Sequence, residues 1–132
     1  MTADLLRRAA TKLREHANAT NFGAEGWIVD LKDSEVTTSD GGMMIADTME
    51  LTGTRPDASY IALMHPPVAL ALAAWLEQQA RHVADAVAAW SRDPGYINAH
   101  LGGVDAHTAN MFALPFGVAR EILREPAAGG AA

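Results

Sequence analysis

Side chains that could bind a metal ion gather at one place in the sequence, between residues 100 and 107. His100, Asp105 and His107 supply two imidazoles and a carboxylate, a set that can hold a divalent ion and leave positions open for water. Their spacing matches no zinc or iron signature, and Asp105 also suits the start of a helix as a cap. A metal-dependent hydrolase using these three residues is therefore one alternative hypothesis. The preferred interpretation includes no metal and no cofactor.

No other motif in the sequence predicts covalent chemistry or phosphate transfer. None of the four serines, Ser34, Ser39, Ser59 and Ser91, lies in a Gly-x-Ser-x-Gly elbow. Glycine-rich loops that cradle phosphates are missing as well. The sequence contains no cysteine, which excludes disulfides and thiolate metal sites. Whether the protein is an enzyme stays open, but these features favour a non-enzymatic protein, and we assign no catalytic residue.

The net charge of the chain and the distribution of its basic residues bear on which partners it could bind. Sixteen acidic residues against ten Lys and Arg give a net charge of −6. A dense basic patch, which is typical of proteins that bind nucleic-acid backbones, does not occur, so we expect no nucleic-acid partner. The basic residues near the N-terminus fall mostly off the apolar face of a predicted helix. Three of them, Arg7, Arg8 and Arg14, could contact an acidic surface of a partner protein.

Arginines elsewhere support a second alternative, a small-ligand binder that sequesters a nucleotide. Such a protein needs several guanidinium groups that converge on one pocket or on a subunit interface. Arg55, Arg81 and Arg92 are the nearest candidates in the sequence. A nucleotide that binds only the folded protein would raise its melting temperature, which distinguishes this alternative from the others.

The elements that carry the candidate residues are predicted to be mainly helices. Apolar residues at three- and four-residue steps predict an amphipathic helix over residues 2–18 and one long helix over about 67–92. Between them, short β-type segments separated by turn residues predict a two- or three-stranded antiparallel sheet over about 26–48. We expect Trp27 and Ile45 to hold this sheet against the helices.

The remaining elements are expected to be short. A proline-led start predicts a short helix after the sheet, with Tyr60, Ile61 and Met64 on one face. Residues 95–103 are predicted to form a loop, and the last helix is predicted over about 105–125 with a kink or break at Pro115. The expected apolar face of that helix consists of Met111, Phe112, Phe116, Ala119, Ile122 and Leu123.

Several segments resemble a known group of proteins. They are the Leu5-Leu-Arg-Arg-Ala-Ala segment, Asp57-Ala-Ser-Tyr-Ile-Ala-Leu-Met-His-Pro66, Val68-Ala-Leu-Ala-Leu-Ala-Ala-Trp-Leu76 and Gly117-Val-Ala-Arg-Glu-Ile-Leu123. In this order they resemble small uncharacterised proteins of actinobacterial bacteriophages and prophages, distantly similar to Ead-type phage accessory proteins. Residues 19–27 depart from that pattern. The resemblance implies a phage origin, and it carries no activity and no catalytic residue.

Taken together, the sequence predicts a single α+β domain over residues 1–126 and a flexible tail at 127–132. A small antiparallel sheet would pack against three or four helices, with the long helix at its centre. The preferred function is that of a phage accessory protein that binds a host or phage protein, or a second copy of itself, in the host cytoplasm. No apolar run approaches the roughly 20 residues that cross a membrane. Trp90 is a further candidate for the partner interface, since tryptophan is enriched in binding hot spots.

Overall fold

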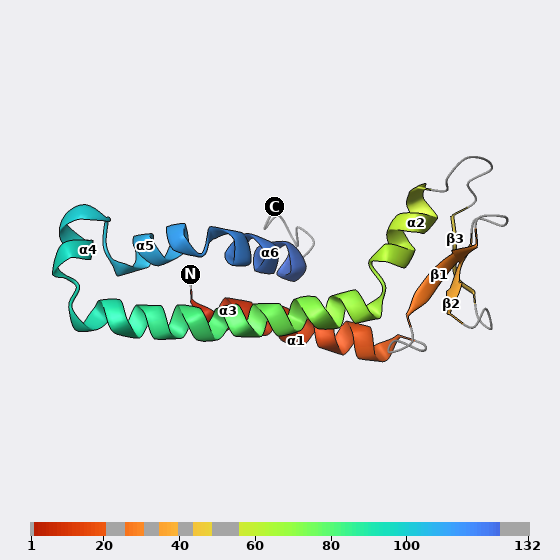
Figure 1. The fold of residues 1–132 in the computed structure, drawn as a ribbon, viewed down its shortest axis with the longest axis horizontal. Helices are drawn as coiled ribbons and strands as arrows, with labels where there is room; N and C mark the ends of the chain where they lie inside the picture. The colour runs from red at the N-terminus through yellow and green to blue at the C-terminus, as the bar shows by residue number, and fades with distance from the viewer. Residues whose placement is uncertain (1, 21–25, 31–34, 40–43, 49–55, 125–132) are drawn as a thin grey trace, which may run out of the picture. The chain divides into compact units, whose positions relative to one another are not determined.

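The structure is a computed structural model that describes residues 2–20, 26–30, 35–39, 44–48 and 56–124. These residues form six helices and one three-stranded sheet (Figure 1). The prediction of an α+β fold with a small antiparallel sheet and one long helix is confirmed. In chain order the elements are α1 (Ala3–Ala19), β1 (Trp27–Asp30), β2 (Glu35–Thr38), β3 (Met44–Asp47), α2 (Pro56–Leu63), α3 (Pro66–Arg92), α4 (Gly95–His100), α5 (Val104–Met111) and α6 (Ala113–Leu123).

The chain divides into two compact units, and each has its own core. The helical unit joins Met1–Leu13 to Ala73–Ala132, and the sheet unit is Arg14–Leu72. Both α1 and α3 contribute residues to the two units. A single domain over 1–126 stays a prediction, and the tail predicted at 127–132 lies outside the described residues.

Small side chains let the helices of the helical unit pack closely. Positions three, four and seven residues apart share one face of a helix, and on α1 and α3 such positions hold mainly alanine and leucine. Figure 1 shows α4, α5 and α6 returning along α3. The buried residues of this core are Leu6, Ala9 and Ala10 of α1, Ala73, Leu76, Ala80 and Val83 of α3, and Phe116 and Ala119 of α6.

The prediction of a loop over 95–103 is wrong, because its first six residues form α4. Pro94 and Gly95 end α3, but the Asn98 N–H donates to the Pro94 carbonyl at 2.8 Å and starts a new turn of helix. Ile97 is buried by this turn, which supplies apolar contact that a loop would lack. Gly102 and Gly103 then take φ values of 79° and 98°, which few other residues tolerate, and reverse the chain into α5.

Pro115 divides the last predicted helix, as expected, but the break comes three residues before the proline. A proline ring in a helix clashes with the carbonyl four residues earlier, here that of Met111, where α5 ends. Pro115 itself lies in the first turn of α6, where its missing N–H leaves no helical hydrogen bond unmade. Phe112 adopts φ −113° and ψ 30° at the junction.

In the sheet unit, the strands lie in the order β1-β2-β3 and both pairs are antiparallel. β2 is the central strand, and its alternating burial places Val36 and Thr38 inside the unit. Val36 packs with Ala58 and Ala62 of α2, and Trp27 and Ile45 pack around this cluster. The prediction that Trp27 and Ile45 hold the sheet against a helix is therefore confirmed. Of the residues predicted on one face of α2, Ile61 packs against this cluster, whereas Tyr60 and Met64 are exposed, which corrects that part of the prediction.

A histidine fixes the entry to β1. The Trp27 N–H donates to Nδ1 of His65 across 3.1 Å. Gly26 lies directly against the same ring, with φ at 80°, and a Cβ added there would come within 2.5 Å of Nδ1. This contact needs both the bare glycine and an unprotonated Nδ1, since a protonated nitrogen cannot accept the hydrogen bond. Residue 26 is therefore restricted to glycine by its backbone angle and by its neighbour.

Candidate functional site

The three candidate metal ligands occupy separate environments. The ring of His100 packs on Tyr96 with centroids 4.6 Å apart, whereas the ring of His107 packs on Trp90 at 4.5 Å. Asp105 is exposed in the first turn of α5. Within the part of the chain that the structure describes, no group of three His, Cys, Asp or Glu side chains is arranged to hold a metal ion. His100 and His107 therefore pack on different aromatic rings and are not brought together at one site.

Trp90, the predicted interface anchor, lies half-buried near the end of α3. Its ring meets that of His107 from α5 at an interplanar angle of 56°. Tilted pairs of this kind are favoured because the positive edge of one ring approaches the negative face of the other. Trp90 thus joins α3 to α5 inside the helical unit, and its role toward a partner stays a prediction.

The arginines named from the sequence divide into paired and unpaired groups. Arg8 makes an ion pair with Asp4, one helical turn earlier, at 3.2 Å. Arg14 also has an interaction partner. Arg7, in contrast, lines a pocket between α1 and α3 and forms no ion pair with any described residue. Arg7 therefore carries a positive charge that forms no ion pair with the described residues.

Arg81 lines the same pocket from the opposite wall, whereas Arg92 is exposed at the end of α3 and Arg55 lies outside the described residues. The pocket has a volume of about 300 Å³, and its lining consists of Arg7 and Thr11 of α1 with Glu77 and Arg81 of α3. The sequence indicated Arg81 as a candidate ligand-binding residue, but it did not indicate that Arg81 shares a pocket with Arg7. This arrangement depends on how α1 packs on α3, which no local pattern specifies.

The helical unit also carries an apolar groove along α6, which the sequence analysis missed. Leu114 is 81% exposed at its edge, and Met111, expected inside the core, is 60% exposed. The groove has a volume of about 540 Å³, and its lining residues are Ala113, Leu114, Gly117, Val118, Glu121 and Ile122. The signal was present in the sequence, since 111–123 holds more apolar residues than one buried face can use.

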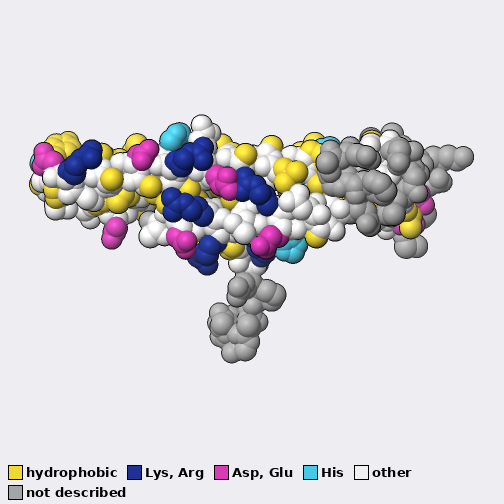
Figure 2. All heavy atoms as spheres, turned by 90° about the horizontal axis from the view of Figure 1, so that it is seen from below, with side chains coloured by type: hydrophobic (Ala, Val, Ile, Leu, Met, Phe, Trp, Pro, Cys, Tyr) yellow, Lys and Arg dark blue, Asp and Glu magenta, His cyan; other side chains and the backbone are white. Residues whose placement is uncertain are grey.

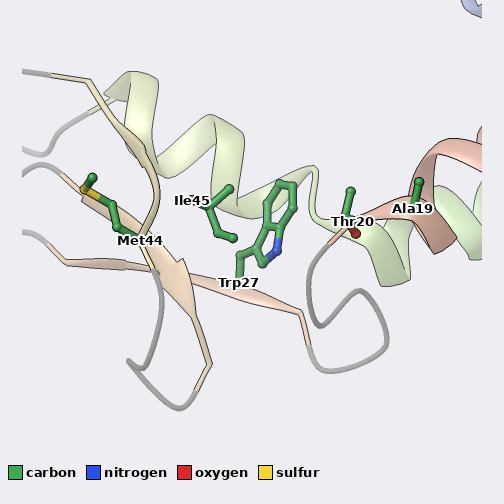
Figure 3. A pocket seen from close by; sticks show the side chains of 5 residues that line it. All are labelled: Ala19, Thr20, Trp27, Met44 and Ile45. Atoms are coloured by element: carbon green, nitrogen blue, oxygen red, sulfur yellow. The ribbon is translucent and has the colours of Figure 1, made fainter.

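Trp27 lines a smaller pocket in the sheet unit, of about 250 Å³. Figure 3 shows its ring between Ile45 of β3 and Thr20 at the end of α1. The Thr20 hydroxyl donates to the Ala17 carbonyl at 2.7 Å. The indole Nε1 is buried and has no hydrogen-bond partner within the described chain. Such a donor raises the cost of burying Trp27 and offers little for binding, because the atom is not reached by solvent.

The surface of the helices is mixed in charge. Figure 2 shows basic and acidic side chains interspersed over one face. This pattern does not present the continuous positive surface that a nucleic-acid backbone requires. Among the described residues no single helix is long and apolar enough to cross a membrane, although α2 and α3 together, with a bend of 49° between them, meet the same criterion of length and composition.

Comparisons with known proteins add no assignment: no protein-family model, no curated protein and no solved structure matches this chain. Two surfaces of the helical unit therefore carry the functional argument. They are the α6 groove, formed by Ala113, Leu114, Gly117, Val118, Glu121 and Ile122, and the α1–α3 pocket, formed by Arg7, Thr11, Glu77 and Arg81.

Proposed function

We propose that this protein acts by protein–protein binding through the α6 groove, as a non-enzymatic accessory protein of a phage in the cytoplasm of its host. The observation that carries the proposal is the exposed apolar surface around Leu114, which water does not favour and a partner would cover. The phage origin is supported only by the resemblance of the sequence segments described above.

The occupant that this groove fits best is a second copy of the chain. Leu114 projects from α6, and Gly117 lies almost one turn further along the same groove. A Cβ added at Gly117 would meet no described atom within 4 Å, apart from nearby backbone of its own helix, so the space above it is open. A projection and a recess on one surface form a self-complementary patch, which is what a two-fold interface requires.

An antiparallel pairing of two α6 helices uses both features twice. With the two-fold axis between Leu114 and Gly117, each leucine is set over the glycine of the other copy. Ala113 then lies opposite Val118 of the partner subunit, so the centre of the contact is apolar. The exposed ion pair between Glu121 and Arg124, at 3.8 Å, lies toward the C-terminal end of α6 and leaves the central contact uncharged.

Light scattering coupled to size exclusion tests the proposal over a range of protein concentrations. We expect a dimer at high concentration that dissociates on dilution. Replacing Leu114 with Glu should weaken dimerisation by about a hundredfold, because burying an unpaired carboxylate costs several kcal/mol. Gly117→Val should act in the same direction by filling the recess without any change in charge.

Leu63→Glu is the matched control, since Leu63 is similarly exposed but lies on α2 of the sheet unit. It should leave the monomer–dimer equilibrium unchanged. A monomer at every concentration, or equal effects of L114E and L63E, would reject the second copy as the occupant. Circular dichroism of each variant separates loss of association from loss of folding.

A further inference from the structure

We propose that the α1–α3 pocket binds the phosphate group of a small molecule, with Arg7 and Arg81 as its ligands from opposite walls and Thr11 as a third donor. This inference does not depend on self-association, because the pocket residues differ from those of the α6 groove.

The two guanidinium groups are available for a ligand. Arg8, next to Arg7 in sequence, is neutralised by Asp4, and Arg124 is paired with Glu121. Within the described residues, neither Arg7 nor Arg81 forms an ion pair. Two like charges that line one pocket repel each other, and a bound anion would remove that repulsion.

The helix geometry holds the donors in place. Arg7 and Thr11 lie four residues apart on α1, and Glu77 and Arg81 lie four residues apart on α3, so each pair shares one helix face. Buried residues of both helices, among them Ala9, Ala10, Ala73 and Ala80, share one core, which holds α1 and α3 together. A site built on packed helices is positioned more precisely than one built on loops.

The donor set favours phosphate over carboxylate. Two arginines and one hydroxyl line the pocket from two helices, and phosphate, with more acceptor oxygens and a higher charge than a carboxylate, can accept from more of these donors at once. Glu77 lines the same pocket and has an interaction of its own. Its charge opposes any anion in the pocket and opposes a stretch of acidic side chains most, so the site suits one small anion held between the two arginines.

A titration followed by amide NMR tests the site with inorganic phosphate and with pyrophosphate, against sodium chloride at equal ionic strength. We expect saturable shifts confined to amides near Thr11 and Arg81, and tighter binding of pyrophosphate. Arg7→Gln and Arg81→Gln should each weaken binding about tenfold or more, since each removes a charge-assisted hydrogen bond. Arg81→Lys should weaken it less, because the charge stays and only the forked geometry is lost.

Arg8→Gln is the matched control: it removes the same charge from the neighbouring position on the same helix. It should change phosphate affinity by less than about twofold, as expected for an exposed charge outside the site. Shifts that do not saturate, an equal loss in R8Q, or binding of a glutamate octapeptide in place of pyrophosphate would each overturn the proposal. All three substituted positions, Arg7, Arg8 and Arg81, are exposed, and light scattering of the four variants should remain that of the parent protein.

Discussion

The helical unit and the sheet unit hold their structures in different ways. The helical unit buries nine residues from three helices in one core, among them Leu6, Leu76 and Phe116. Among the described residues of the sheet unit, the corresponding cluster has three buried members, Val36, Ala58 and Ala62, with partly buried side chains such as Trp27 and Ile45 around it. A three-stranded sheet gains stability when a helix packs on its apolar face, as α2 does here. The contact between Gly26, Trp27 and His65 shows what supplements it, namely a backbone hydrogen bond to a side chain distant in sequence.

The largest expected effect is in the helical core. Phe116→Ala removes the largest fully buried side chain and should lower the free energy of unfolding by about 3–5 kcal/mol. Urea denaturation followed by circular dichroism measures it. Leu114→Ala on the same helix is the control and should change stability by less than about 0.5 kcal/mol, since that side chain is exposed. Similar losses in the two variants would contradict the assigned core.

The next effect falls on the histidine contact of the sheet unit. Gly26→Ala forces an L residue into positive φ and drives its Cβ into the His65 ring, so we expect a loss of about 2–4 kcal/mol in the sheet unit. Hydrogen exchange of the amides of β1 and β2 gives a readout local to this unit.

A double-mutant cycle separates the two causes of that loss. If the ring clash contributes, His65→Ala combined with Gly26→Ala should cost less than the sum of the single changes. Strict additivity would show that backbone angle alone restricts residue 26.

A smaller change of opposite sign is expected on α6. Gly117→Ala adds a methyl group into open space and reduces the freedom of the unfolded chain, so the monomer should gain about 0.5–1 kcal/mol. Thermal unfolding at low protein concentration measures this gain without a contribution from association. A loss of stability would show that the recess above Gly117 is occupied within the monomer.

The smallest effect belongs to the exposed ion pair of α1. Arg8→Gln should cost at most about 0.3–0.5 kcal/mol, because both side chains are well exposed and solvent screens their attraction. The remaining cost should disappear in high salt. A larger, salt-independent loss would mean that Arg8 packs against the core, and it would also disqualify R8Q as the control for phosphate binding.

Elements with a strong local pattern were predictable from the sequence. Which surfaces of those elements form pockets or grooves was not. The apolar stripe of α3 and the strand–turn–strand composition around β2 determine those elements directly. α4 was missed because a proline and a glycine mask six residues that bury Ile97. The pattern predicts Met111 on the apolar face of one helix that continues to Pro115, whereas α5 ends at Met111 and its side chain is exposed. That Arg7 and Arg81 line one pocket could not be predicted without knowing which helices lie side by side.

The buried alanines of α1 and α3 have a consequence for how easily the helical core forms. Ala9, Ala10, Ala73 and Ala80 have no rotamers to lose when they are buried, so these positions add no side-chain entropy cost to the formation of the core. The same close packing leaves no spare volume in the core. A larger side chain at any of these positions would find no free volume in the close-packed interior, and the neighbouring side chains or the backbone would have to move.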